Sequence, residues 1–212
     1  MVVENIKRNA SCSGEYENMH WYYLEGDLYI EVDGPLDMTG NLEFNAFIPQ
    51  DYSEEHLTYP EYAYPWEQVK NEIVQVYIAD GCTAIRWRSF CKHKNLSKVS
   101  IPKSVKEIEW RAFGYCESLE HIELPDGVEI IAEQAFVGCV SLQYLSLPDS
   151  LKKIGAVAFA SCGKLDRVVI PNGIEEIGIG AFSRAKQVVA PKRFELKESN
   201  PFLGVGEVIY QD

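Results

Sequence analysis

The sequence predicts a solenoid of stacked parallel β-coils, and a 23-residue repeat is the main evidence for it. Phenylalanine gives the clearest series, at Phe90, Phe113, Phe136, Phe159 and Phe182. Four other residue types recur at the same 23-residue step, in series that begin at Ile85, Leu96, Pro102 and Cys116. A fixed period in which each position keeps its own residue type is typical of a solenoid.

The unit from residue 119 to residue 139 shows how each repeat is expected to fold. Ile122 and Leu124 alternate with polar residues, which is the pattern of a half-buried strand. Pro125 ends this strand because it cannot donate a hydrogen bond to a ladder, and the Asp-Gly pair after it supplies a turn. A second short apolar segment follows, and Ala135-Phe136 then predicts a tight corner.

A single coil of this kind cannot bury its apolar side chains, so the coils must stack. Full burial of each large apolar side chain contributes roughly 1.5–3 kcal/mol, and stacking therefore makes the core. The strands of successive coils are expected to pair in parallel, about 4.8 Å apart. The fold class is thus a parallel β-solenoid with short turns or helical corners.

Three regions follow from where the repeat begins and ends. Residues 1–70 form an acidic, aromatic-rich β capping region, and residues 71–191 form a solenoid of about five coils that starts near Ile73. A sixth coil is truncated, since Pro191 follows the preceding proline of the series by less than one full repeat. Residues 192–212 break the pattern and are expected to form a C-terminal cap.

The repeat resembles the BspA-type leucine-rich repeats of bacterial proteins. The resemblance is carried by the segments 119–128 and 135–142, read as Leu-Glu-His-Ile-Glu-Leu-Pro-Asp-Gly-Val and Ala-Phe-Val-Gly-Cys-Val-Ser-Leu. The aromatic segment 21–30 and Pro65-Trp66 resemble the leader of the same proteins, so the likeness covers nearly the whole chain. It implies a leucine-rich-repeat solenoid, usually of a secreted or cell-surface protein that binds other macromolecules. No catalytic residue defines this family.

Charge is placed very unevenly along the chain. Residues 1–70 hold 3 Lys and Arg against 14 Asp and Glu, whereas residues 71–212 hold 17 against 18. An acidic leader on a nearly neutral solenoid argues against nucleic acid and anionic membranes as partners. The sequence has no stretch of about 18 apolar residues that could span a bilayer, so no membrane insertion is expected.

The acidic leader, residues 1–70, contains a predicted β-hairpin. Residues 21–32 alternate in polarity on either side of a turn at Glu25-Gly26-Asp27. We expect this hairpin to cap the apolar end of the first coil, because an open solenoid edge promotes aggregation. An independent sugar-binding domain is the alternative, since aromatic and carboxylate side chains together suit carbohydrate.

Cysteine occupies one slot in three successive coils, at Cys116, Cys139 and Cys162. The distance between adjacent coils would permit a disulfide. However, His93 and Ala185 fill the same slot in other coils, which favours buried, reduced cysteines that act as small apolar residues. A zinc site is not expected, because the chain has no Cys-x-x-Cys motif. No cofactor is predicted.

The outward side of the first strand in each coil is one candidate binding surface. We call it the strand face and define it by six residues: Tyr77, Lys98, His121, Glu123, Tyr144 and Arg167. The mixture of aromatic and charged side chains suits the recognition of a partner. A merely solvated sheet would have a similar composition.

A second candidate surface combines aromatic and basic residues of the first two coils. We call it the aromatic-basic patch and define it by five residues: Arg86, Trp87, Arg88, Trp110 and Arg111. The two tryptophans are one repeat apart and occupy one slot. They could receive a sugar or a carboxylate, or they could pack under the acidic leader, with the arginines pairing carboxylates such as Glu61 and Glu67. The charge of the leader favours the second interpretation.

The sequence therefore predicts a non-catalytic interaction module that binds a protein or glycan partner, and an adhesin-like role is one form that this function could take. A structural or scaffolding repeat protein is the alternative, and a carbohydrate-active enzyme is a distant third. The resemblance suggests secretion or surface display. The first residues lack the apolar core of a signal peptide, however, so either a signal was removed or the protein stays in the cytoplasm.

Overall fold

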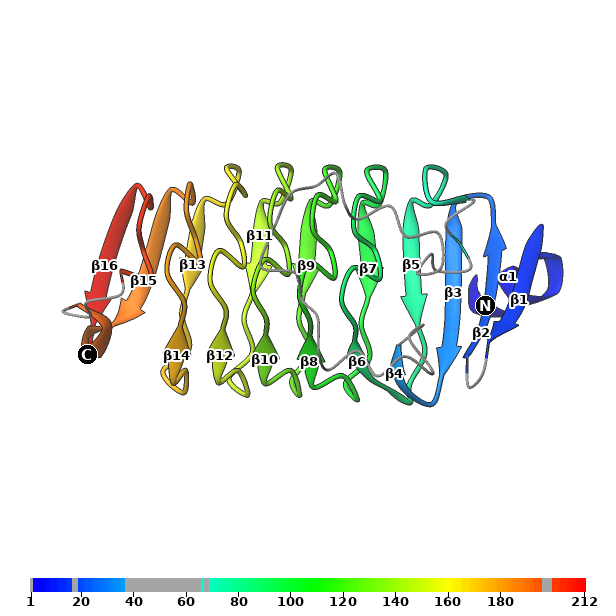
Figure 1. Ribbon diagram of the computed structural model, residues 1–212, viewed down its shortest axis with the longest axis horizontal. Coiled ribbons are helices and arrows are strands. Elements are labelled where there is room, and N and C mark those ends of the chain that lie inside the picture. The colour runs from blue at the N-terminus through cyan, green and yellow to red at the C-terminus, as the bar shows by residue number, and fades with distance from the viewer. Residues whose placement is uncertain (1, 17–18, 37–65, 67–68, 196–199) are drawn as a thin grey trace, which may run out of the picture.

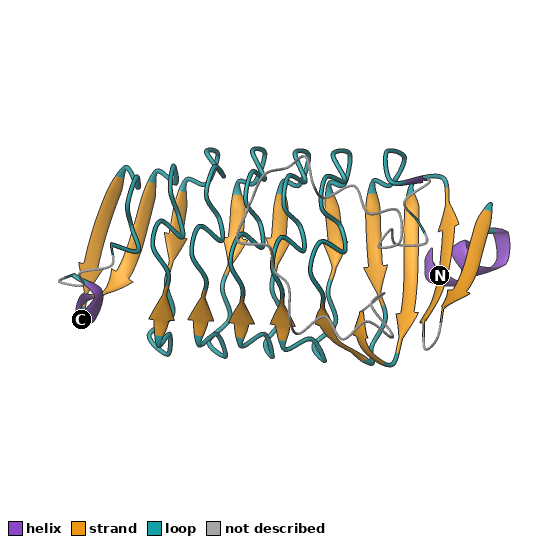
Figure 2. Cartoon of the chain, viewed as in Figure 1, coloured by secondary structure: helices purple, strands orange, loops and turns teal. Residues whose placement is uncertain are grey.

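The computed structural model describes residues 2–16, 19–36, 66, 69–195 and 200–212. In these residues the chain winds into an elongated row of coils, with the N-terminal region at one end and the C-terminal strand at the other (Figure 1). Strands line two sides of the row and turns connect them (Figure 2). The predicted parallel β-solenoid is confirmed.

The first side of the solenoid carries one strand from each coil. In chain order these strands are β5 (Gln75–Ile78), β7 (Lys98–Ser100), β9 (His121–Glu123), β11 (Tyr144–Ser146), β13 (Arg167–Val169), β15 (Gln187–Pro191) and β16 (Glu207–Gln211). The pairs β5–β7, β9–β11, β13–β15 and β15–β16 are hydrogen-bonded in parallel. Side chains of alternate residues along each strand therefore point into the core and outward.

The second side is a continuous parallel sheet in the order β14-β12-β10-β8-β6-β4. Its strands are β4 (Gly34–Leu36), β6 (Cys82–Ile85), β8 (Glu107–Ile108), β10 (Ile130–Ile131), β12 (Lys153–Ile154) and β14 (Glu176–Ile177). The register follows the sequence repeat, since Ile131 is paired with Ile108 on one side and Ile154 on the other. One sequence repeat thus equals one coil.

Tight turns form the third side of each coil, and they are hydrogen-bonded from coil to coil. The backbone N–H of Phe113 donates to the carbonyl of Ala135, and the N–H of Phe136 donates to the carbonyl of Ala158, both at 2.8 Å. Two residues per turn adopt positive φ, four positions apart, as Arg111 and Tyr115 do at 52° and 61°. These corners are turns and not helices.

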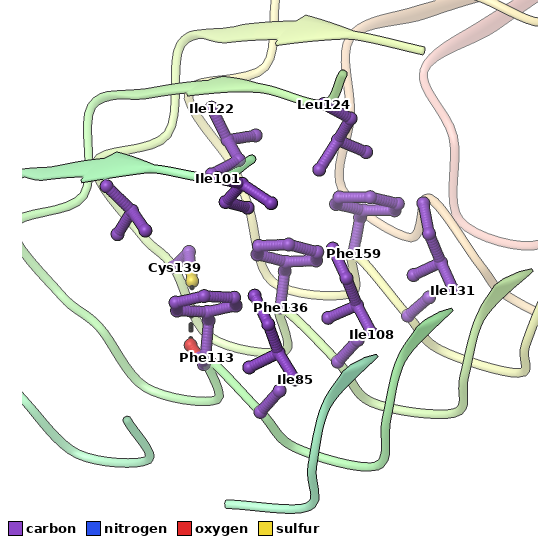
Figure 3. Close-up of a cluster of buried hydrophobic side chains, with 14 of the residues drawn as sticks. Ile85, Ile101, Ile108, Phe113, Ile122, Leu124, Ile131, Phe136, Cys139 and Phe159 are labelled. Atoms are coloured by element: carbon purple, nitrogen blue, oxygen red, sulfur yellow. Dashed lines mark hydrogen bonds between the residues drawn. The ribbon is translucent and has the colours of Figure 1, made fainter. Parts of the chain in front are cut away.

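The core is built around a column of phenylalanine rings. All five members of the repeat series are fully buried. Consecutive rings stack with centroids 5.0–5.4 Å apart and planes within 11° of parallel. Isoleucines of the two sheets flank the rings, as Figure 3 shows for Ile122 of the first sheet and for Ile108 and Ile131 of the second. The prediction that each Phe of the series is buried in a column is confirmed.

The repeated cysteines close the core beside this column. The thiol of Cys139 donates to the carbonyl oxygen of Phe113 at 3.2 Å (Figure 3). Cys116 and Cys162 make the equivalent contact with the carbonyls of Phe90 and Phe136. All six cysteines of the chain lie in the described residues, and none of them forms a disulfide.

The N-terminal region joins the solenoid as additional strands. The hairpin β2 (Met19–Leu24) and β3 (Asp27–Val32) turns at Glu25-Gly26, both of which have positive φ, as a two-residue hairpin turn requires. Strand β3 then pairs in parallel with β5, and β4 pairs with β6. The inward side chains of β2 and β3 belong to the same apolar core as the coils. The described part of the leader therefore extends the solenoid and is not a separate domain.

The outer edge of the leader is formed by strand β1 (Cys12–Tyr16), which pairs antiparallel with β2, and by helix α1 (Val2–Asn9). Helix α1 lies against the outward side of the hairpin, because the Lys7 ammonium nitrogen lies 5.1 Å from the ring centroid of Tyr29 and 2.5 Å from a carboxylate oxygen of Glu31. Glu61 and Glu67, which were expected to pair with the arginines, lie outside the described residues.

At the other end, the step between coils becomes shorter than the 23-residue repeat. Val168 is paired with Val188, and Val188 is paired with Val208. A short 3₁₀-helix (Lys192–Phe194) lies between the last two strands. Residues 192–212 were expected to break the repeat and form a cap. Within this region, residues 207–211 add another parallel strand, β16, to the end of the first sheet.

Candidate binding surfaces

The six residues of the strand face lie on one side of the molecule, as the sequence repeat predicts. They come from β5, β7, β9, β11 and β13, and their side chains point away from the core. Lys98 is in register with Gln75 of the preceding coil, and Tyr144 is in register with His121. All of the strand-face residues except the half-buried Tyr77 are exposed.

Two aromatic rings form the centre of the strand face. The imidazole of His121 and the phenol ring of Tyr144 stack with centroids 4.7 Å apart and planes only 3° apart. Tyr144 nevertheless keeps 64% of its surface exposed to solvent. Neighbouring strands thus fix the positions of two aromatic side chains on an open surface.

Helix α1 covers the N-terminal end of the same side of the sheet. Tyr29 continues the outward column that Tyr77 begins, since the two residues are paired in register. Tyr29 is buried, whereas Glu123 and Val169 farther along this column are exposed. The accessible part of the strand face therefore extends from β7 to β13.

The aromatic-basic patch lies on the turn side of the first two coils. The indole rings of Trp87 and Trp110 are tilted by 45° with centroids 5.9 Å apart, and both are half-buried. Arg86 forms an ion pair with Glu109 of the next coil. The other carboxylate oxygen of Glu109 accepts a hydrogen bond of 3.2 Å from the backbone N–H of Trp87.

Arg111 is the most buried cation of this patch, with 9% of its surface exposed. Its guanidinium carbon lies 4.7 Å from the ring centroid of Trp110 and 5.8 Å from that of Tyr115. Its Nε donates a hydrogen bond of 2.7 Å to the amide oxygen of Gln134. The polar side-chain partners described for Arg86 and Arg111 are thus Glu109 and Gln134 of the next coil. The leader carboxylates Glu61 and Glu67, which were expected to pair with the arginines, lie outside the described residues.

Tyr115 belongs to the same turn side, although the repeat pattern did not single it out. It occupies the slot four residues after Arg111, and Lys92 occupies that slot in the preceding coil. The corresponding residue of the next coil is Gly138, and a β-carbon there would lie 2.7 Å from the Tyr115 ring. Each turn has two equivalent positions four residues apart, here Arg111 and Tyr115. A comparison of both positions across the repeats would have placed Tyr115 beside the patch.

The second sheet presents a different kind of surface. Its exposed charges pair with opposite charges one coil away, as in Lys106–Glu129 at 3.6 Å and Lys153–Glu176 at 3.0 Å. Such exposed pairs contribute about 0–1 kcal/mol each. This side of the solenoid therefore carries exposed charges that are partly paired between neighbouring coils.

The buried cysteines are not suited to nucleophilic chemistry. Burial raises the pKa of the Cys116 and Cys139 thiols well above the ordinary value. Because the thiolate is the reactive form, these residues remain unreactive while the fold is intact. Across the described segments, no group of three or more His, Cys, Asp or Glu residues is arranged to hold a metal ion.

The family model for the BspA-type leucine-rich repeat region matches six copies over residues 68–196, which is more than half of the chain. The chain belongs to the BspA-type leucine-rich repeat family. Leucine-rich repeat proteins are commonly protein-interaction or surface proteins and typically have no enzymatic activity. The structure describes no helix that is long and apolar enough to cross a membrane.

Solved bacterial structures share this fold. A T. pallidum leucine-rich repeat protein is 25% identical with a TM-score of 0.57, and the match covers 93% of this chain and 82% of that protein. A leucine-rich repeat protein from Eubacterium ventriosum is 20% identical (TM-score 0.62, 87% and 43% covered). The pneumococcal vaccine antigen PcpA is 19% identical (TM-score 0.53, 91% and 51% covered). The chain thus spans about half of the last two proteins. Comparison with curated proteins gave no match.

Proposed function

We propose that this protein is a non-catalytic interaction module that binds a protein partner through the strand face. The observation that supports this proposal best is the exposed stack of His121 and Tyr144. Tyrosine is enriched among the residues that dominate the energy of protein interfaces. A stacked pair also loses little conformational entropy when a partner covers it, because its geometry is already fixed.

The charges around this stack support the same surface. Lys98 lies on the N-terminal side of the stack, Arg167 on the C-terminal side, and Glu123 beside it. Unlike the charges of the second sheet, these three form no ion pair with any of the residues described here. Unpaired exposed charges can complement a partner and set the specificity of binding.

Site-specific photo-crosslinking can test this assignment. Tyr144 is replaced by p-benzoylphenylalanine, and Glu129, which directly precedes β10 of the second sheet, is replaced in the same way as a matched control. Both positions are exposed, so solvent access does not distinguish them. After illumination with extracellular and surface proteins of the source organism, we expect one defined adduct at position 144 and none at position 129.

The other outcomes would contradict the proposal. Equal adducts at both positions would indicate non-specific contact, and the absence of an adduct at position 144 would favour a structural or scaffolding repeat. Binding on a glycan array that is lost in Trp110→Ala would assign the function to a glycan and to the aromatic-basic patch. The two experiments thus separate protein binding, glycan binding and a structural role.

A further inference from the structure

The turn side of the first two coils concentrates positive charge on a chain whose formal net charge is −12. Three cations belong to this corner, Arg88, Lys92 and Arg111, and we call them the corner cations. The turns that carry them are hydrogen-bonded to each other, since the backbone N–H of Arg88 donates to the Trp110 carbonyl at 3.1 Å. The backbone N–H of Lys92 likewise donates to the Gly114 carbonyl at 2.8 Å, so the turns that carry the three cations lie side by side. Burial raises the pKa of the nearby Cys91 thiol, and the charges of Arg88, Arg111, Lys92 and Lys70, in that order, oppose the rise.

Arg111 is the central member of this group. It is nine-tenths buried. Its side chain donates one hydrogen bond, from Nε to the neutral amide oxygen of Gln134. Among the described residues no carboxylate forms an ion pair with it. The nearby acid Glu109 is engaged by Arg86 and by the Trp87 N–H. Burying a charge is costly, and an anion beside the guanidinium lowers that cost.

The aromatic rings of the corner are already in contact with other groups. The guanidinium of Arg111 lies over Trp110, and that of Arg88 lies 5.9 Å from the ring centroid of Trp87. The two indoles also pack against each other. A sugar needs an open ring face for stacking, and each indole already has a guanidinium near its ring. The geometry therefore favours recognition of an anionic group over stacking of a sugar ring.

We propose that the corner cations form a second binding site, distinct from the strand face, for the carboxylates of an acidic peptide segment. The terminal nitrogens of the Arg111 guanidinium bind one carboxylate, because Nε is already engaged by Gln134. Arg88 and Lys92 attract the neighbouring carboxylates of the same segment. The aromatic rings of Trp110 and Tyr115 hold Arg111 in position for this contact.

The binding of hexaglutamate to the full chain tests this site, with tryptophan fluorescence and calorimetry as readouts. We expect saturable binding at low ionic strength that weakens as salt is added, since exposed charges are screened. Arg111→Gln is expected to weaken binding about tenfold or more, the factor that corresponds to one charged hydrogen bond. The double variant Arg88→Gln/Lys92→Gln, which changes more accessible side chains, serves if Arg111→Gln does not fold.

Arg184→Gln is the matched control, because Arg184 occupies the same slot as Lys92 four coils later and has the same positive φ sign. We expect the affinity of this variant to equal that of the unmodified chain. Equal weakening in Arg184→Gln and in the double variant would overturn the proposal, as would the absence of hexaglutamate binding. Binding of inorganic phosphate or hyaluronan oligosaccharides, but not hexaglutamate, would contradict the assignment to a peptide. A variant with alanine at His121 and Tyr144 should bind hexaglutamate normally, because the strand face is not part of this site. A failure of the proposed function can therefore be distinguished from a failure of the peptide site.

Discussion

The indole ring of Trp66 stacks on the phenyl ring of Phe90, with ring centroids 5.7 Å apart and planes 14° apart. Trp66 is fully buried and extends the phenylalanine column beyond its first member. Its separation from Phe90 along the chain is slightly longer than the repeat step. The leader thus contributes a ring to the core of the solenoid.

Replacing Trp66 by alanine should destabilise the whole chain. The loss of a fully buried indole costs about 3–5 kcal/mol of unfolding free energy. Trp66→Phe preserves a stacked ring and should retain most of this stability. Chemical denaturation monitored by far-ultraviolet circular dichroism measures both variants. A loss below about 1 kcal/mol for Trp66→Ala, well under the cost of emptying a core site, would contradict the role of Trp66 in the column.

The same measurement applies to the middle of the column. Phe136 stacks on Phe113 on one side and Phe159 on the other, so Phe136→Ala opens a cavity that neither neighbour can fill. We expect a loss of about 3–5 kcal/mol. Val140→Ala, at an exposed position of the next turn, is the control and should change stability little. Similar losses for the two variants would argue against a stacked core.

Gly155 is expected to tolerate no side chain. A β-carbon there would lie 2.4 Å from the backbone nitrogen of Glu133 and 2.6 Å from the carbonyl carbon of Ala132. Gly155→Ala should therefore force the coils apart and cost about 1–3 kcal/mol. Gly163→Ala is the matched control, since nothing lies within 4 Å of a β-carbon at that position. Thermal unfolding should show a lower midpoint for the first variant and no loss for the second.

Val157 is a point of local strain that can be relieved. Its φ of +49° is in the left-handed region, which a β-branched residue rarely adopts, and Gly180 fills the same slot in the next coil. The left-handed conformation costs about 1–2 kcal/mol for most residues and less for asparagine. Val157→Asn should therefore raise the unfolding midpoint. Val137→Asn, at a position without positive φ, should not, and a lower midpoint for Val157→Asn would contradict the strain.

All six cysteines should be fully reduced, and the three repeated cysteines should be inaccessible while the protein is folded. Cys116, Cys139 and Cys162 are buried, and their thiols donate to backbone carbonyls. A thiol reagent should recover all six cysteines after denaturation without reductant, and it should not label these three before denaturation. Recovery of fewer than six would indicate a disulfide and would contradict the structure.

The sequence predicted those parts of the fold that repeat with one period. The series of Phe136 and Cys139 specified the column and its flanking thiols, because the same packing problem recurs in every coil. Strand β16 was missed because the step from Gln187 to Glu207 is shorter than the repeat, so a search in the repeat frame does not align the two. The position of Trp66 was missed for a similar reason, since its step to Phe90 is longer than the repeat.

The candidate surfaces were predicted less completely than the fold. Periodicity placed His121 and Tyr144 side by side, but it could not show that their rings stack. It also placed Trp87 beside Trp110. The pairing of Arg86 with Glu109 and of Arg111 with Gln134 depends on the direction of each side chain, which a repeat pattern does not specify.

The affinity of the cross-linked partner for variants of the strand face tests the central claim most directly. In the intact chain, His121 and Tyr144 are replaced together by alanine, and Glu129→Ala serves as the control on the second sheet. Calorimetry with the purified partner should show at least about tenfold weaker binding for the double variant, the effect of losing an interface hot spot. Its unfolding midpoint should be unchanged, because both side chains are exposed. Unchanged affinity in the double variant, or an equal loss in Glu129→Ala, would contradict the assignment of binding to the strand face.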